Sequence, residues 1–343
     1  MRAWILRTPA PMEEQPLTLV DVPTPEPGPH EVRIKVSVCG ICRTDLHIAE
    51  GDLPAGKNDL VLGHEIVGVV DALGEHVGGV SEGERVGVTW LGRTCGQCRH
   101  CAAGRENYCA DFQATGRDVD GGFAEYAVAH ETAVFSLGRI ALPQAELTPF
   151  LCAGVAGYCA YRLMDAAQGT TIGLYGFGPT AYYVLRVARH FGHGVFVSSR
   201  SARKLGWALH HGADWTGTAK DEMPGPLDAA IVFPPAGELV EQALEHIKPG
   251  GALVLAPVAM SEIQIADYSR HFWGRDIRTL YNVNRRDAEA FLALAARLDL
   301  GLPTEVVPFG ELQKAMMRLK RGQIAPAHVA VGVRESEMAR AAR

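Results

Sequence analysis

The pattern of hydrophobic and polar residues changes about midway along the chain. Up to about residue 149, short apolar runs such as Glu31 to Val38, Ile66 to Val70 and Glu125 to Val128 are separated by turn residues, among them Pro23 to Pro29. Runs of this length bounded by Pro and Gly are typical of short strands. The first half therefore predicts an irregular, mostly antiparallel β domain.

After about Ala153, apolar strands alternate with helical patterns. The expected strands are residues 171–175, 195–198, 228–233 and 252–255, and the expected helices are 181–191, 202–211 and 239–247. Apolar strands separated by helices indicate parallel βαβ units in a doubly wound sheet. We therefore assign residues 153–283 to a second domain. Residues 284–343, with two helical segments and a last strand at 327–333, are expected to return to the first domain, residues 1–152.

Composition narrows the functional class. Of 343 residues, 47% are hydrophobic and 21% are charged, as in ordinary globular proteins. The net charge of −6 argues against nucleic acid or an anionic membrane as the main partner. No apolar stretch approaches the roughly 20 residues of a membrane span, and the first residues are too polar for a signal peptide. We therefore expect a cytoplasmic protein, in which clustered cysteines bind metal more often than they form disulfides.

Four of the eight cysteines lie within fifteen residues at C-x2-C-x2-C-x7-C spacing: Cys95, Cys98, Cys101 and Cys109. A loop with this spacing brings four thiolates to the corners of a tetrahedron, the closed geometry of structural zinc. Two disulfides in a secreted protein are an alternative, which the polar N-terminus disfavours. A zinc module that contacts nucleic acid is another, which the acidic charge balance disfavours.

The remaining cysteines are spread over distant segments: Cys39, Cys42, Cys152 and Cys159. Two thiolates and the imidazole of His64 would form a Cys2His site, whose fourth position stays open for water or substrate, as in catalytic zinc. Taken singly, a histidine such as His64 is more often a core or loop residue with satisfied hydrogen bonds, and a cysteine such as Cys152 is more often a small buried hydrophobic residue. Spacing alone does not bring three distant segments together.

A glycine-rich turn follows the first strand of the second domain. It reads Gly176-Phe177-Gly178-Pro179-Thr180-Ala181, a G-x-G-x-x-A sequence between a predicted strand and a predicted helix. The first glycine suits a tight turn, the second admits a pyrophosphate, and the small last residue lets helix and strand pack closely. The helix N-terminus then holds the phosphates. A glycine turn without a nucleotide is the alternative.

Together these segments resemble the zinc-dependent medium-chain alcohol dehydrogenases over essentially the whole chain, and most closely their bacterial, propanol-preferring type. The segments that carry the resemblance are Cys39 to His47, Gly63 to Glu65, the four-cysteine loop, Cys152 to Val155 and Tyr175 to Gly178. The resemblance implies an α/β architecture with two domains. A GroES-like irregular β domain would carry catalysis, and a Rossmann domain with a doubly wound parallel sheet would bind the dinucleotide.

The resemblance also implies two zinc ions per chain. Cys42, His64 and Cys152 match the ligands of the catalytic zinc, and Glu65 matches a carboxylate that lies beside the metal or reaches it in some relatives. Asp45 matches a carboxylate that orients His64. The four clustered cysteines match the structural zinc site. Cys39 and Cys159 match no site position, so we interpret them as buried packing residues.

Further roles follow from the same resemblance. Thr44 would accept the alcohol proton and pass it, through the nicotinamide ribose, towards His47. Trp90 matches a pocket-lining aromatic residue, although ordinary core packing explains it equally well. Many relatives have an arginine near the last strand that contacts the pyrophosphate, where this chain has Ala325 to His328. Arg43 is a candidate for that contact.

The end of the second strand of the Rossmann domain bears on the choice of cofactor. NAD-specific relatives have an acidic residue there, which binds the adenosine ribose. This chain has Val197 to Lys204 without a carboxylate, and Ser199 falls at the position of the acid. Ser199 and Arg200 are suited to bind a 2′-phosphate. We therefore expect NADP(H) rather than NAD(H), with NAD(H) as the alternative.

The function predicted from the sequence is reversible hydride transfer between a nicotinamide cofactor and small alcohols, aldehydes or ketones. A polyol or sugar dehydrogenase of the same fold is an alternative. A non-enzymatic, zinc-stabilised binding protein is disfavoured because the ligands, Thr44 and the glycine turn are all present. Resemblance further implies a homo-oligomer, with a tetramer favoured over a dimer.

Overall fold

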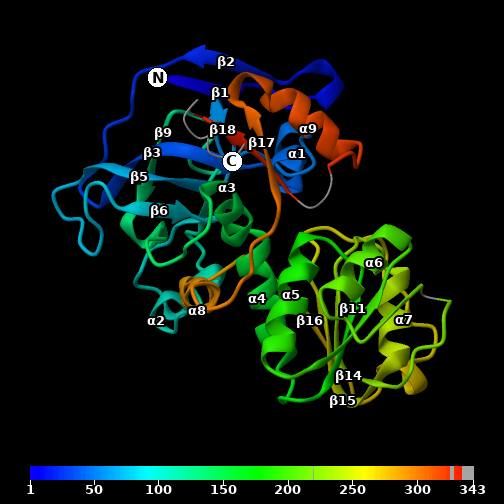
Figure 1. Ribbon diagram of the computed structural model, residues 1–343. Coiled ribbons are helices and arrows are strands. Elements are labelled where there is room, and N and C mark those ends of the chain that lie inside the picture. Colours follow the sequence, from blue (N-terminus) through cyan, green and yellow to red (C-terminus); the bar gives the residue numbers. More distant parts are fainter. Residues whose placement is uncertain (219, 325–327, 334–343) are drawn as a thin grey trace. The chain divides into compact units, whose positions relative to one another are not determined.

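The computed structural model describes residues 1–218, 220–324 and 328–333, and the chain divides into two compact units (Figure 1). Unit 1 combines Met1–Cys152 with Asn282–Arg343, and unit 2 is Ala153–Tyr281. The first boundary falls where the hydrophobic pattern changes. The second unit 1 segment begins at Asn282, whose side chain hydrogen-bonds to Trp90 of the same unit.

Unit 1 is built around β-sheets. Its largest sheet has the order β10-β6-β5-β3-β18-β17, and β9 also pairs with β3, while β2-β1-β4 and β7-β8 form two small sheets. The strands of unit 1 are β1 (Arg2–Leu6), β2 (Leu17–Asp21), β3 (Glu31–Gly40), β4 (Leu60–Val61), β5 (Glu65–Leu73), β6 (Arg85–Val88), β7 (Leu91–Arg93), β8 (Gln113–Ala114), β9 (Tyr126–His130), β10 (Val134–Ser136), β17 (Thr304–Pro308) and β18 (His328–Gly332). The named strands pair antiparallel except β17 with β18, which confirms the irregular, mostly antiparallel domain.

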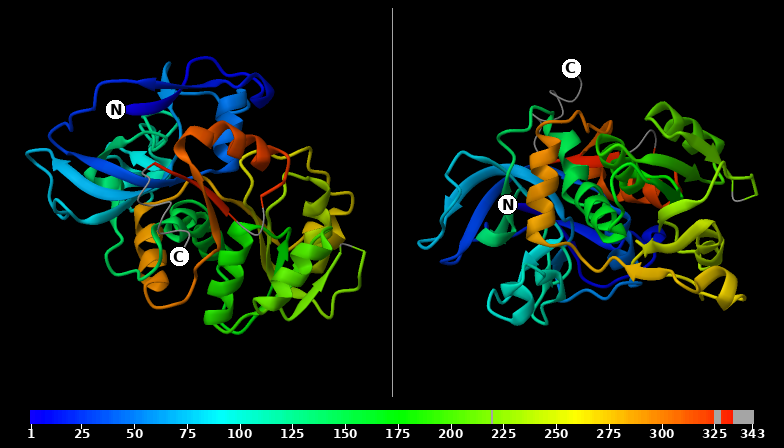
Figure 2. Two further views of the ribbon diagram at one scale, coloured as in Figure 1. Left: turned by 45° about the horizontal axis from the view of Figure 1, so that its top comes forward. Right: turned by 90° about the horizontal axis from the view of Figure 1, so that it is seen from below.

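The helices of unit 1 are short and lie around these sheets. They are α1 (Arg43–Glu50), α2 (Arg99–Ala102), α3 (Gln144–Leu147), α8 (Arg285–Ala295) and α9 (Leu312–Lys320), with 3₁₀ helices at Met12–Glu14, Glu106–Tyr108, Glu131–Ala133, Thr148–Leu151 and Phe309–Glu311. Helix α9 lies beside α1, far away in sequence, and Lys320 Nζ is 2.7 Å from Glu50 Oε1 (Figure 2). The segment that begins at Asn282 thus belongs to unit 1.

Unit 2 is a doubly wound parallel sheet of order β13-β12-β11-β14-β15-β16. Its elements are α4 (Ala153–Met164), β11 (Thr171–Tyr175), α5 (Pro179–His190), β12 (Gly194–Ser198), α6 (Ala202–His210), β13 (Trp215–Gly217), β14 (Leu227–Val232), α7 (Glu238–His246), β15 (Ile247–Leu255), the π-helix η5 (Tyr268–Phe272) and β16 (Asp276–Thr279). The predicted strands and helices of this unit are all present. The sequence pattern missed α4, β13 and β16.

Helices pack closely on the sheet of unit 2. Ala230 and Val232, alternate residues of β14, share an apolar cluster with Leu244 of α7. Helix α5 packs against α4, and a Cβ on Gly157 of α4 would lie 2.9 Å from the Thr180 carbonyl oxygen. The Tyr182 ring of α5 stacks on Trp207 of α6. These contacts hold the N-terminus of α5 at the end of β11.

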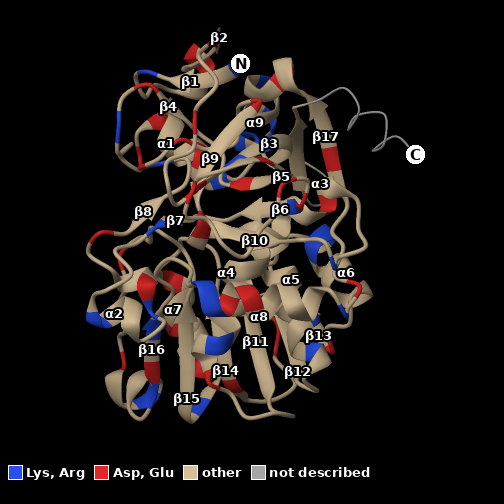
Figure 3. Ribbon diagram, turned by 90° about the vertical axis from the view of Figure 1, so that its left-hand side faces the viewer, with Lys and Arg blue, Asp and Glu red and all other residues tan. Residues whose placement is uncertain are grey.

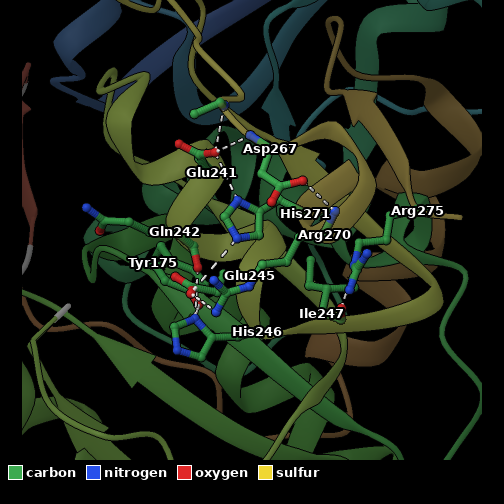
Figure 4. A network of polar contacts seen from close by, with 11 residues as sticks. Tyr175, Glu241, Gln242, Glu245, His246, Ile247, Asp267, Arg270, His271 and Arg275 are labelled. Carbon is green, nitrogen blue, oxygen red and sulfur yellow. Dashed lines mark hydrogen bonds and ion pairs between the residues drawn. The ribbon is translucent and has the colours of Figure 1, made fainter. Parts of the chain in front are cut away.

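A polar network joins α7 to the segment that contains η5 (Figure 4). Glu241 Oε1 accepts hydrogen bonds from the backbone N–H of Ala266 at 2.7 Å and from His271 Nδ1 at 2.9 Å. Arg270 pairs with Glu245 at 3.2 Å. The network holds the segment that precedes β16 against helix α7.

Acidic and basic residues are interspersed along both units (Figure 3). Among the described residues, no helix has the length and hydrophobicity needed to cross a bilayer.

Candidate active site

The first turn of α1 is built around Cys42 and Asp45. Cys42 lies at the N-cap with extended backbone, and its N–H donates to Asp45 Oδ2 at 2.8 Å in a capping box. The other oxygen, Asp45 Oδ1, is 3.2 Å from Nδ1 of His64. Both side chains are buried, with 0% and 1% exposed. Asp45 therefore fixes the imidazole with Nε2 available, the usual arrangement behind a metal-binding histidine.

Three predicted metal ligands and Glu65 converge on one point in unit 1. Ligand atoms of Cys42, His64, Glu65 and Cys152 lie within 4.8 Å of one another. Nε2 of His64 is buried and has no hydrogen-bond partner among the described residues. The two sulfur atoms are 3.8 Å apart. A tetrahedral zinc ion with bonds of about 2.3 Å to sulfur separates its ligands by about 3.8 Å, so the donor set fits zinc.

Cys42 has the electrostatic character of a ligand. A hydrogen bond from the Cys152 thiol holds the pKa of Cys42 well below its usual value, although burial alone would raise it. The thiolate is the form of cysteine that binds metal. Cys39, in contrast, is fully buried in β3, where burial raises the pKa of its thiol. The structure thus places Cys42, and not Cys39, at the site.

Glu65 has a second neighbour that the sequence did not single out. His328 Nε2 lies 2.7 Å from Glu65 Oε2, and the two side chains are 7% and 1% exposed. Burial raises the pKa of the Glu65 carboxyl, and the charge of His328 opposes this. Ala325, Pro326 and Ala327 lie outside the described residues.

The residues of the predicted proton relay lie on α1. Thr44 Oγ1 is 3.7 Å from Cys42 Sγ, which places the hydroxyl next to the candidate metal ligands. His47 lies one helical turn further, and its Nδ1 is 3.0 Å from Asp52 Oδ2. Arg43, at the start of the helix, is exposed.

Trp90 also contacts the candidate metal ligands. Its ring meets His64 edge to face, with the ring centroids 5.2 Å apart. Its Nε1 donates to Asn282 Oδ1 at 3.0 Å, and Asn282 Nδ2 donates to the Asn107 carbonyl at 3.4 Å. Asn282 therefore links Trp90 to the end of the four-cysteine loop. No short-range signal in the sequence identifies this link, because it joins three distant segments.

The four clustered cysteines form a second group whose sulfur atoms all lie within 4.8 Å of one another. Cys98 and Cys101 are 3.6 Å apart, and Cys95 and Cys109 are 3.5 Å apart, again close to the edge of a zinc–sulfur tetrahedron. Backbone N–H groups of Gln97 and Cys98 lower the pKa of Cys95 to about 7. All eight cysteines are free, so the disulfide alternative is not observed.

The glycine turn of unit 2 has the predicted form. Gly176 adopts a φ of 85°, and a Cβ there would lie 2.7 Å from Pro234, so a side chain is excluded. Gly178 is the N-cap of α5, and Pro179 occupies the first helical position. Nothing lies within 4 Å of a Cβ built on Gly178, so the backbone is open to a phosphate there. Ala181 is fully buried.

Ser199 and Arg200 follow β12 and precede α6. The N–H of Ser199 donates to the Gly217 carbonyl at 2.9 Å, and its Oγ accepts from the Ser201 N–H at 3.4 Å. Arg200 is exposed. The Ser199 side chain is therefore held at the end of the strand, while the guanidinium of Arg200 is accessible to an anion.

Comparison with known proteins identifies the family. The family description "Alcohol dehydrogenase GroES-like domain" matches residues 28–139. The "Probable alcohol dehydrogenase AdhA" of Mycobacterium tuberculosis is 40% identical over 335 residues, which cover 96% of this chain and 96% of that protein. The chain belongs to the zinc-dependent medium-chain alcohol dehydrogenases.

Solved structures agree with this assignment. A cinnamyl alcohol dehydrogenase of Sorghum bicolor matches with a TM-score of 0.85 and 28% identity, covering 97% of both chains. A thermostable alcohol dehydrogenase of Pyrobaculum aerophilum, solved with cobalt and zinc bound, matches with a TM-score of 0.86 and 25% identity, covering 97% of this chain and 99% of that one. The protein is therefore an NAD(P)-dependent alcohol dehydrogenase with a GroES-like domain and a Rossmann domain.

Most of the residues expected to act in this dehydrogenase lie in two groups. Cys42, Thr44, His64, Glu65 and Cys152 come together within unit 1. The glycine turn, Ser199 and Arg200 belong to unit 2. Sequence reasoning missed His328 and Asn282, whose contacts depend on strand register and on the long-range fold.

Proposed function

We propose that this alcohol dehydrogenase acts on small alcohols and on the matching aldehydes or ketones, with a catalytic zinc held by Cys42, His64 and Cys152. The observation that supports this most directly is the buried, unpartnered Nε2 of His64 beside two sulfur atoms 3.8 Å apart. Two thiolates and one imidazole leave one position open for a substrate oxygen. When bound, zinc supplies a Lewis acid that polarises a carbonyl oxygen and lowers the pKa of an alcohol.

Two residues of α1 would then transfer the hydroxyl proton of the alcohol away from the site. Thr44 Oγ1, next to the candidate ligand Cys42, would accept the hydroxyl proton of the substrate while its own hydroxyl proton passes to the nicotinamide ribose of the bound cofactor. His47, whose Nδ1 is paired with Asp52, would take up the proton from the ribose and release it towards solvent. Asp45 keeps His64 oriented throughout.

A second zinc would be held by Cys95, Cys98, Cys101 and Cys109. Four sulfur atoms complete the coordination of this ion and leave no position for substrate, so its role is structural. The stoichiometry is then two zinc ions per chain.

NADP(H) is the proposed cofactor. The N-terminus of α5 and the turn from Gly176 to Ala181 would hold the pyrophosphate, with Arg43 as a further contact. The end of β12 has Ser199 and Arg200 where NAD-specific proteins have a carboxylate. The Arg200 guanidinium would therefore attract a 2′-phosphate, and no carboxylate stands at this position to repel it.

Measuring absorbance at 340 nm with a panel of short alcohols, polyols and sugars tests the proposal. We expect the highest kcat/KM for small primary or secondary alcohols with NADP⁺. A preference for polyols or sugars would favour the alternative dehydrogenase class, and no turnover with any of them would contradict the substrate assignment.

We also propose a cytoplasmic homo-oligomer, with a tetramer favoured. Among the described residues, five of the eight exposed large hydrophobic side chains fall between Val258 and Tyr281, the segment around β16. Strand β16 is an edge strand of the parallel sheet. Exposed edges and apolar patches are typical of interfaces. Light scattering in solution tests this: a monomer at micromolar concentration would contradict the proposal.

A further inference from the structure

The Glu65 carboxylate has two competing neighbours. One of its oxygens belongs to the group of ligand atoms with Cys42, His64 and Cys152, all within 4.8 Å of one another. Its Oε2 lies 2.7 Å from His328 Nε2. A carboxylate oxygen is a good zinc ligand, and it is also the natural partner of an imidazole. The position of this one side chain therefore bears on whether the fourth metal position stays open.

Strand register brings Glu65 and His328 together across a glycine. Gly40 at the end of β3 pairs with Glu65 of β5 on one side and with Ala330 of β18 on the other. A Cβ on Gly40 would lie 1.9 Å from Glu65 Oε2 and 2.8 Å from His328 Nε2. No side chain fits at position 40. Because glycine has none, the Glu65 carboxylate and the His328 imidazole meet across β3, the strand between β5 and β18.

The contact between Glu65 and His328 is close and buried, but its geometry is not that of a well-aligned hydrogen bond. Neither Glu65 Oε2 nor His328 Nε2 has a hydrogen-bond partner of good geometry among the described residues. Removing the His328 imidazole would leave the buried Glu65 carboxylate without its partner, which is unfavourable in an apolar interior. The carboxylate would then bind another nearby group. For Glu65 that group would be the metal.

We propose that His328 is a positioning residue that draws the Glu65 carboxylate away from the metal and so keeps the fourth coordination position open to the substrate oxygen. This inference rests on the proposed zinc site of Cys42, His64 and Cys152. Without the imidazole, Glu65 occupies the fourth position and competes with substrate.

Cobalt substitution gives a readout other than activity. The visible spectrum of protein loaded with Co²⁺ reports the ligands of the metal, and imidazole serves as an added ligand for the open position. We expect His328→Leu to change the spectrum before imidazole is added and to weaken imidazole binding by about 10–100-fold, the usual scale for residues behind a metal ligand. The KM for alcohol should rise more than kcat falls.

A double variant isolates the carboxylate. Glu65→Gln combined with His328→Leu should restore the spectrum and the imidazole affinity of Glu65→Gln alone, because the amide is a weak zinc ligand. His76→Leu, an exposed histidine of the same unit, is the matched control and should change neither. The four-cysteine site contributes equally to every spectrum, so difference spectra remove it.

The outcomes separate this inference from the zinc assignment. If His328→Leu binds Co²⁺ with the spectrum and imidazole affinity of the unaltered protein, or if the double variant fails to reverse the change, the positioning role is wrong. If His328→Leu does not fold, His328→Phe takes its place, because it keeps a ring in that space and has no donor for Glu65. That variant should show the same change of spectrum and the same weakening of imidazole binding, and an affinity equal to that of the unaltered protein contradicts the role. If replacing Cys42 removes no Co²⁺, the zinc assignment itself fails.

Discussion

At the residue scale, the hydroxyl of Thr44 carries the proposed proton step. Thr44→Ala should lower kcat by about 10²–10⁴-fold, the scale of a positioned proton-transfer group. Thr44→Ser should keep most of the activity, because only the hydroxyl beside Cys42 is needed. Steady-state kinetics of the two variants check this. Near-normal turnover by Thr44→Ala would show that the proton leaves by another route.

Arg200 decides the proposed preference for NADP(H). Arg200→Ala should lower the ratio of kcat/KM for NADP⁺ over NAD⁺ by about tenfold, because a charge-assisted contact to the 2′-phosphate is lost. Arg162→Ala, an exposed arginine on α4 of the same unit, is the control and should leave the ratio unchanged. An unchanged ratio in Arg200→Ala, or a native preference for NAD⁺, would mean that no phosphate is bound there.

The site contacts that the sequence identified join residues close together in the chain, and those that it missed join residues far apart. Cys42 and Asp45 are three residues apart, and a capping box joins them locally. His328 reaches Glu65 only because β18 pairs with β3 in one register, and a sequence pattern does not fix that register. Asn282 likewise joins Trp90 to Asn107 across three segments. Contacts within one helical turn could therefore be predicted from the sequence, but contacts that depend on strand register or on the long-range fold could not.

At the element scale, the four-cysteine loop should depend on its metal. Cys98→Ser should remove one zinc equivalent and lower the thermal midpoint by about 10 °C, since each kcal/mol lost moves the midpoint by about 2–4 °C in a folding unit of the size of unit 1. Zinc analysis and calorimetry measure both effects. Cys159→Ala, buried in α4, is the control and should keep two zinc ions. Full zinc content and an unchanged midpoint in Cys98→Ser would contradict a structural role.

His193 should make the stability of unit 2 depend on pH. It is fully buried after α5, and burial lowers the pKa of its imidazole from 6.5. The unfolded chain then binds more protons below about pH 6.5, so the free energy of unfolding falls as the pH falls through this value. His193→Gln should show a shallower fall, while the exposed His190→Gln should follow the unaltered protein. Denaturant titrations between pH 7 and 5 test this, and identical slopes would contradict it.

Elements were predicted best where their pattern was strongly apolar. Strands β11, β12 and β14 are largely buried, and their residues were assigned to within one or two positions. Strand β16 was missed because none of its four residues is buried, so it has no hydrophobic signal. Helix α1 was also missed, because its eight residues are too few to show a helical period, although Leu46, Ile48 and Ala49 are buried in the core.

At the scale of the whole molecule, chemistry is divided between two folding units. The candidate metal ligands and Thr44 belong to unit 1, and the turn that would bind the dinucleotide belongs to unit 2. The hydrophobic pattern of the sequence changes near residue 153, and unit 2 begins at Ala153. Asn282, the residue at which the chain returns to unit 1, hydrogen-bonds to Trp90, and such a polar contact leaves no mark in a hydrophobic pattern.

The most direct test of the central claim is the zinc content of the purified protein and of Cys42→Ser. We predict two zinc ions per chain in the unaltered dehydrogenase. Cys42→Ser should keep one zinc, a native circular dichroism spectrum and less than about one thousandth of the turnover, because only the open site is lost. Full activity with one zinc or none in the unaltered protein, or an active Cys42→Ser with two zinc ions, would contradict a catalytic zinc held by Cys42, His64 and Cys152.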